Sequence, residues 1–193
     1  MKFTQLPANT FETLQLNAGI IASAFDPETG VIERGDITGA TTGGVSFADV
    51  PEYSDFGEDI DNCPKNTKEL KRIVSREITM SGTYLTVDTA RAKSLVAAAD
   101  ASEDGKITPR DNLLDTDFTD LWWIGDYSDK NGDTNGGYIA IHLKNALSTG
   151  GFALQSTDRA KGQFAFTYTA HYSIENTAEV PYDMYIKAGT EEA

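Results

Sequence analysis

Residues 100–111 carry oxygen-bearing side chains at the spacing of a calcium-binding loop. Asp100, Ser102 and Asp104 stand at the first, third and fifth positions, Gly105 at the sixth and Asp111 at the twelfth. In such a loop the carboxylate and hydroxyl oxygens bind Ca²⁺, and the glycine allows the sharp turn between them. One hypothesis is therefore a monomeric calcium-dependent binding module.

Two features of the same stretch argue against calcium. The twelfth residue is an aspartate, which is shorter than the glutamate that usually closes the site with both oxygens. Pro109 stands where a second helix should begin, and the chain has no paired loop of the same kind. We therefore expect a polar turn after a helix, and no functional metal site.

The other reactive residue types are isolated in the sequence. His142 and His171 have no second metal ligand at a suitable spacing, and Cys63 has neither a helix start nor a base beside it. No serine elbow, phosphate loop or dinucleotide glycine pattern occurs. Carboxylates are plentiful, so a small hydrolase with a carboxylate pair remains a hypothesis, although nothing singles out two of them. We expect a protein that is not an enzyme and has no cofactor.

Composition limits the function further. The 193 residues suit one domain, and the net charge of −14 argues against a protein that grips nucleic acid through its phosphates. A single cysteine allows no intramolecular disulfide. We expect no signal peptide, because the first residues hold no apolar run of sufficient length, and no membrane span, because no stretch approaches about 20 apolar residues.

The elements that would position these residues are mostly strands. Residues 71–87 alternate apolar and polar side chains, and we expect a bulge at Gly82, where the parity changes. Asp88 is a suitable cap for a short helix. The apolar stripe of that helix consists of Ala92, Leu95, Val96 and Ala99.

The remaining chain also reads as strands joined by turns. We expect strands at residues 19–25, 31–32, 36–47, 120–126, 138–147, 164–174 and 182–187. The stretch 164–174 has the clearest alternation, with Phe164, Phe166, Tyr168, Ala170, Tyr172 and Ile174 on one face. A hairpin turn is predicted at residues 128–137. The sequence thus predicts a mainly β fold with one flanking helix, as two packed antiparallel sheets or a partly open barrel.

Two segments do not follow this pattern. Residues 1–17 read as an N-terminal arm, and residues 48–70 as a long acidic loop without hydrophobic periodicity. Loops of this length inside a compact domain are usually functional or disordered. We predict that this loop contacts a partner through three apolar anchors and two cations, namely Tyr53, Phe56, Ile60, Lys65 and Lys68.

Several strings resemble the major tail (tail tube) proteins of long-tailed bacteriophages and prophages. They are residues 39–44, 55–65, 78–99, 121–127, 145–152 and 164–172. The resemblance extends over most of the chain, and none of these strings is a catalytic signature.

The resemblance implies a structural virion protein that forms hexameric rings, which stack into the tube through which the genome leaves the virion. It implies as partners other copies of the chain and the tail-tip initiator, tape-measure and terminator proteins. DNA would pass through the lumen without specific binding, and the protein would be made in the host cytoplasm and end in the tail. An acidic protein suits such a channel, because like charge gives the phosphates no counter-ion to release.

Overall fold

The fold is described from a computed structural model, for residues 3, 5–130 and 136–190. In chain order the elements are η1 (Phe11–Thr13), β1 (Ile20–Ala22), η2 (Arg34–Asp36), β2 (Ile37–Gly39), β3 (Thr41–Asp55), β4 (Lys71–Tyr84), α1 (Thr89–Val96), β5 (Ala99–Ala101), β6 (Ile107–Pro109), η3 (Asp115–Asp117), β7 (Thr119–Tyr127), β8 (Gly137–Ser148), β9 (Ala153–Gln155), β10 (Gln163–Ala170) and β11 (Tyr182–Lys187).

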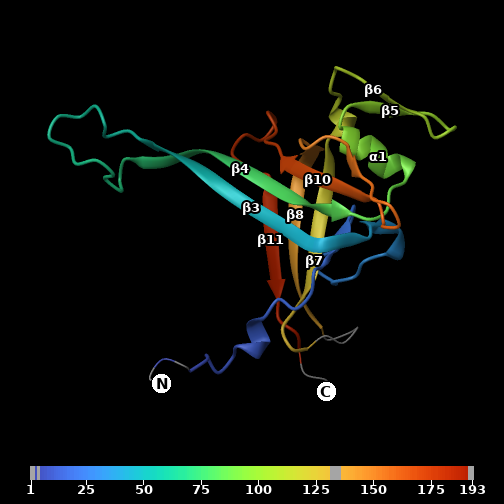
Figure 1. Cartoon of the computed structure of the whole chain (residues 1–193). Coiled ribbons are helices and arrows are strands. Elements are labelled where there is room, and N and C mark those ends of the chain that lie inside the picture. The colour runs from blue at the N-terminus through green and yellow to red at the C-terminus, as the bar shows by residue number, and fades with distance from the viewer. Residues whose placement is uncertain (1–2, 4, 131–135, 191–193) are drawn as a thin grey trace.

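The main sheet is antiparallel and branches at β8. Its strand order is β2-β1-β7-β8-β10-β4-β3, with β11 paired to β8 and β9 paired to β10. On one edge of β8, Tyr138–Leu143 pair with β11 and Ala146–Ser148 pair with β10. Between them Asn145 has a left-handed backbone, with φ 49°. The two groups of strands diverge from this point, as Figure 1 shows.

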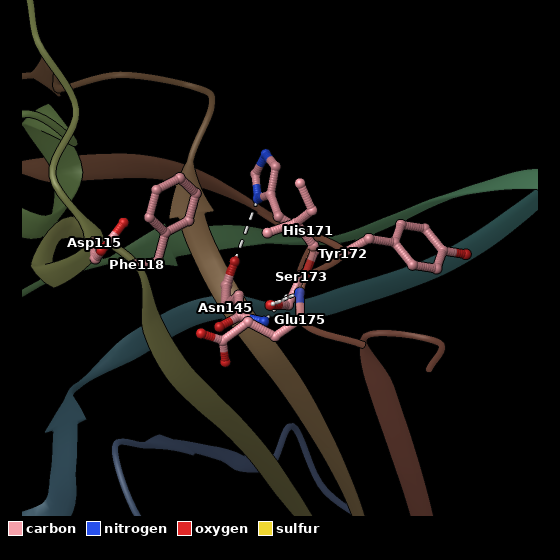
Figure 2. Close-up of a pocket in the computed structure, with 8 residues that line it drawn as sticks. Asp115, Phe118, Asn145, His171, Tyr172, Ser173 and Glu175 are labelled. Carbon is pink, nitrogen blue, oxygen red and sulfur yellow. Dashed lines mark hydrogen bonds between the residues drawn. The ribbon is translucent and has the colours of Figure 1, made fainter. Parts of the chain in front are cut away.

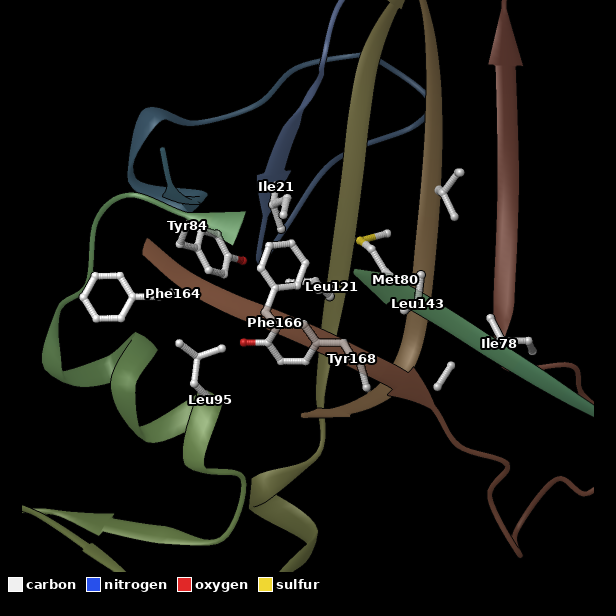
Figure 3. Packing of buried hydrophobic residues seen from close by; sticks show 13 residues of the cluster. Ile21, Ile78, Met80, Tyr84, Leu95, Leu121, Leu143, Phe164, Phe166 and Tyr168 are labelled. Carbon is white, nitrogen blue, oxygen red and sulfur yellow. The ribbon is translucent and has the colours of Figure 1, made fainter. Parts of the chain in front are cut away.

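The divergence lets one half of the sheet pack over the other. The rings of Phe47 on β3 and Tyr182 on β11 lie 5.3 Å apart, although these strands are not paired. The main core fills the space between the halves (Figure 3). It includes Ile78, Met80 and Tyr84 from β4, Phe164, Phe166 and Tyr168 from β10, Leu121 from β7, Leu143 from β8 and Leu95 from α1. The prediction of a mainly β fold with one helix and antiparallel sheets, not closed into a barrel, is confirmed.

The hairpin of β7 and β8 is covered on both faces. Leu121 faces the main core, and its neighbour Trp122 faces a second cluster with Ala22 and Ala140. The expected turn chemistry at Asn131, Gly132 and Asn135 falls outside the described residues.

The helix α1 begins where the sequence predicts. The Asp88 carboxylate accepts a 2.7 Å hydrogen bond from the Arg91 amide, which caps the first turn. The helix ends at Val96 because Ala97 takes a left-handed conformation, with φ 70°. Ala99 is buried as expected but belongs to β5, so the helical part of the apolar stripe is shorter than predicted.

Several boundaries differ from the sequence expectations. The bulge lies opposite Gly82, at Gly43 and Gly44 of β3, while β4 keeps one parity through Tyr84. Gly82 stays inward-facing, and a Cβ there would lie 2.8 Å from Phe166. The strand β10 ends at Ala170, so Tyr172 and Ile174 are exposed instead of buried. The stretch expected as a polar turn after the helix belongs to the small β5–β6 hairpin, which spans residues 99–109.

Candidate functional site

The most distinctive surface feature is a projecting hairpin. β4 pairs with β10 only from Thr79 to Tyr84, whereas its pairing with β3 continues outward to Lys71. Within the part of the chain that the structure describes, residues 50–77 therefore have no sheet neighbour beyond each other, and Figure 1 shows them extending from the body. We call residues 50–77 the arm. The prediction of a loop from residue 48 is wrong for residues 48–55, which belong to β3, and the loop spans only residues 56–70.

The predicted loop began too early in the sequence because two strands can pair through their backbones without an alternation of apolar and polar side chains. On β3, Val50, Glu52 and Tyr53 pair with Glu77, Ser75 and Ile73 of β4. Their backbones complete the ladder, while their side chains face water. Apolar and polar residues alternate where one face of a strand is buried, so a strand with two exposed faces does not show this alternation.

The tip of the arm is organised by its own residues. The Asp55 carboxylate accepts hydrogen bonds from the amides of Asn66 at 2.7 Å and Gly57 at 2.9 Å. These backbone donors stabilise the charged form and hold the pKa of the Asp55 carboxyl below its usual value. Gly57 is buried against Leu70 and Cys63, where a Cβ would lie 2.8 Å from the Leu70 side chain. The tip is thus folded before any partner arrives.

The five predicted contact residues all lie on the arm and are exposed. Tyr53 is 54% exposed, Phe56 62% and Ile60 52%. The lysine side chains each pair with a nearby carboxylate, Lys65 with Glu58 at 3.4 Å and Lys68 with Glu69 at 3.5 Å. The structure therefore places the anchors and cations on one projection but gives the two lysines separate partners.

A polar cluster at the base of the arm was not predicted. The Asp49 carboxylate on β3 pairs with Arg76 on β4 and accepts a 2.9 Å hydrogen bond from the hydroxyl of Tyr182 on β11. Burial and the nearby Asp49 charge raise the pKa of Tyr182. The cluster connects the arm to the far half of the body. Sequence gave no signal for it, because Asp49 and Tyr182 are distant along the chain.

The candidate calcium loop folds as the β5–β6 hairpin. Asp100 lies in β5 opposite Thr108, and its carboxylate forms a 2.9 Å ion pair with Arg110. The Ser102 amide donates to the Lys106 carbonyl at 2.9 Å, which closes the turn around Asp104 and Gly105. Asp111 follows β6. Among the residues that the structure describes, no group of three or more His, Cys, Asp or Glu is placed to hold a metal ion.

The two histidines and the cysteine lie in separate places. His142 stacks on Trp122 with ring centroids 4.0 Å apart and contacts Asp120 at 3.0 Å. Cys63 lies at the arm tip beside Thr67.

His171 lines a cleft of about 530 Å³ between the start of β7, the end of β8 and the segment that follows β10 (Figure 2). The sequence did not single out this cleft, whose walls also include Asp115, Phe118, Asn145 and Glu175.

No helix within residues 3, 5–130 and 136–190 is long and apolar enough to cross a membrane.

Comparison with known proteins finds little similarity. No family model matches the chain, and no curated protein matches it. A solved chain from the structure described as "Virion of native gene transfer agent (GTA) particle" aligns with 89% of this chain and 96% of its own length. The identity is 9% and the TM-score is 0.42.

Proposed function

We propose that this chain is a structural virion protein, the subunit of a phage-type tail tube built from stacked hexameric rings around a channel for the genome. The observation that carries the proposal is the arm: a folded hairpin that projects from the body and exposes Tyr53, Phe56 and Ile60. Such exposure marks an interaction surface. The strings that resemble tail tube proteins include the arm tip, residues 55–65, and the body strands that support it.

The contact that the arm makes must join different surfaces. An arm on one side of a protomer and an acceptor elsewhere form a heterologous contact, which generates rings or open stacks. The net charge of −14 suits a channel that DNA crosses without binding. In this proposal the protein is not an enzyme, and its partners are other copies together with the tail-tip initiator, tape-measure and terminator proteins.

The test removes the arm and keeps the body. Residues 53–74 are replaced by Asn-Gly, so that the paired residues Glu52 and Ser75 flank a two-residue turn. The cluster of Asp49, Arg76 and Tyr182 is retained. A matched control replaces the exposed turn at residues 157–160 with Gly-Ser.

Negative-stain microscopy with a nucleating tail tip provides the measurement. We expect tubes from the parent and the control, and a folded but non-elongating subunit from the arm variant. Normal tubes from the arm variant would exclude the arm as the stacking element. A parent that stays monomeric at high concentration, even with the tail tip, would contradict the proposed function itself.

A further inference from the structure

The second hydrophobic cluster of the body is open on one side. Its buried members in the described chain are Ala22, Trp122 and Ala140. The side chains around them that also line a groove of about 560 Å³ are only half-buried, and they are Phe25, Ile32, Ile124 and Tyr138. The cluster therefore presents an incomplete apolar surface, which apolar side chains of a partner can complete.

The remaining wall of the groove is small and almost uncharged. Ala18 and several glycines line it and leave it open. Asp126 is the one charged residue in the wall within the described chain, and its carboxylate accepts a 2.5 Å hydrogen bond from the Asn17 side-chain amide. A charged group that entered the groove would lose water against walls that are otherwise mostly apolar. The groove therefore suits an uncharged, apolar side chain.

The N-terminal segment, residues 3–16, has the matching chemistry. Phe3 is 92% exposed, Leu6 73% and Phe11 65%. The single charged residue of the segment is Glu12, although the whole chain carries a net charge of −14. Two strongly acidic copies repel each other, so a contact is favoured through a segment that adds little charge. The N-terminal segment thus offers exposed apolar side chains without a charge pattern that opposes contact.

The tip of the arm fits the groove less well. Phe56 and Ile60 lie in a stretch that also contains three carboxylates, those of Glu58, Asp59 and Asp61. A groove with apolar walls would have to take these carboxylates out of water. The N-terminal segment avoids this cost, because Glu12 stands six positions after Leu6.

The N-terminal segment leaves the body instead of folding into the groove of its own chain. Its root is fixed to the end of β7, where the Leu16 amide donates to the Asp126 carbonyl at 3.0 Å. The Ser128 amide donates to the Leu14 carbonyl at 2.8 Å. Beyond the root, backbone hydrogen bonds within residues 7–13 shape a turn, and Figure 1 shows the outer part pointing away from the body. A second copy is therefore the molecule that the apolar side chains of the segment can reach.

We propose that the groove beside Ile124 receives the N-terminal segment of a second copy of this chain. Phe3 and Leu6 of one copy complete the second cluster of the next copy, while Glu12 stays in water. Donor and acceptor are different surfaces, so the contact is heterologous and can close into a ring. This inference rests on the proposed function, because assembly brings the second copy to the groove, and it identifies a contact distinct from the arm.

The first test disrupts each side of the contact separately. One variant carries Phe3→Ser and Leu6→Ser, which remove the two apolar side chains from the segment. A second carries Ala18→Phe, which places a ring in the groove from an exposed position of its wall.

Each variant has a matched control. Ala160→Phe adds the same ring at an exposed turn. Leu113→Ser together with Leu114→Ser removes two exposed apolar side chains elsewhere. Circular dichroism should show that every variant is folded.

Nucleated tube elongation, followed by light scattering, provides the readout. We expect the segment variant and the groove variant each to slow elongation by at least about tenfold, and both controls to stay within about twofold of the parent. Because the two variants disrupt the same contact, the combined variant should elongate no more slowly than the slower of the two.

A cross-link between two different chains shows whether the contact is intermolecular. In a Cys63→Ser background, one chain carries Leu6→Cys and the other carries Ala18→Cys. A short bismaleimide should join the mixed chains into a heterodimer during assembly, and neither chain alone should be joined to itself. Thr157→Cys, at an exposed turn, replaces Ala18→Cys in the control and should give no product.

The outcomes separate this inference from the proposed function. If the parent forms tubes but the variants elongate like their controls, or the mixed chains give no heterodimer, the docking site is wrong and the tube proposal stands. If a chain with both cysteines is cross-linked only within itself, the segment occupies its own groove and the inference is overturned. If the heterodimer forms but the parent makes no tubes with a nucleating tail tip, the contact stands and the tube proposal falls.

Discussion

Two hairpins of the same sheet, β3–β4 and β7–β8, have opposite surroundings. Trp122 and Leu121 on β7 are 7% and 6% exposed, because the two faces of that hairpin pack against different clusters. Val50 and Val74 on the arm are 58% and 54% exposed, although β3 and β4 pair along the arm apart from a bulge at Val74. The comparison shows that strand pairing alone does not mark a core. What separates the hairpins is whether a third element covers them.

The largest difference in stability between the body and the arm is expected when one aromatic ring is removed from each region. Phe166→Ala should lower the free energy of unfolding by about 3–5 kcal/mol, because the buried ring leaves a cavity. Tyr53→Ala on the arm and Thr167→Ala on the other face of β10 should each cost less than about 1 kcal/mol. Urea unfolding measures all three. Similar losses at Phe166 and Tyr53 would mean that the arm belongs to the core.

A second effect should depend on pH and come from a buried tyrosine of the body. Burial raises the pKa of Tyr84 from 10.0 to about 12. The folded state therefore holds the phenol proton more tightly than the unfolded chain does. This stabilisation is complete below pH 10 and is lost as the pH rises toward 12, by about 2–3 kcal/mol. Tyr84→Phe should flatten this decrease in the free energy of unfolding, which urea unfolding across this pH range measures.

A substitution at the junction between the arm and the body should have a smaller effect on stability. Tyr182→Phe removes the hydroxyl that donates to Asp49 and should cost about 1 kcal/mol in stability. It should also broaden the distance distribution between a spin label on Cys63 and one on Thr157→Cys, because the arm loses a contact with β11. Tyr172→Phe, at an exposed position, is the control. An unchanged distribution in the Tyr182 variant would show that β-sheet pairing alone sets the direction of the arm.

The smallest effect is expected at the β5–β6 hairpin. Calorimetry on chelated protein should detect no calcium binding tighter than about 10⁻⁴ M, because Arg110 already pairs with Asp100. A micromolar dissociation constant that is abolished by Asp104→Ala would contradict this expectation and restore the calcium hypothesis.

The sequence predicts the body better than it predicts the arm, for a physical reason. Alternation at Phe164, Phe166 and Tyr168 reflects one buried face, and these residues are buried. Helix capping by Asp88 depends only on residues that are close in the sequence, and this prediction is also confirmed. The arm strands expose both faces, so residues 48–55 carried no pattern that could distinguish a strand from a loop.

The candidate site was only partly accessible from sequence for a different reason. The exposed anchors Tyr53, Phe56 and Ile60 could be selected because a purely solvated loop has little need of them. The cleft is built from Phe118, Asn145 and His171, which come from three separate parts of the chain. No spacing rule connects such residues, and only the register of β8 with β7 and β10 brings them together.

The branching of the sheet at β8 has a consequence for the order of folding during synthesis. The strands β3 and β4 are separated only by the loop of residues 56–70 and can pair as soon as both have left the ribosome. β8 cannot complete its second edge until β11, the last strand of the described chain, has emerged. The contact of Phe47 with Tyr182 closes at the same late stage. A nascent chain therefore displays a paired arm before it possesses a finished body, and early contacts between neighbouring nascent chains would begin at that arm.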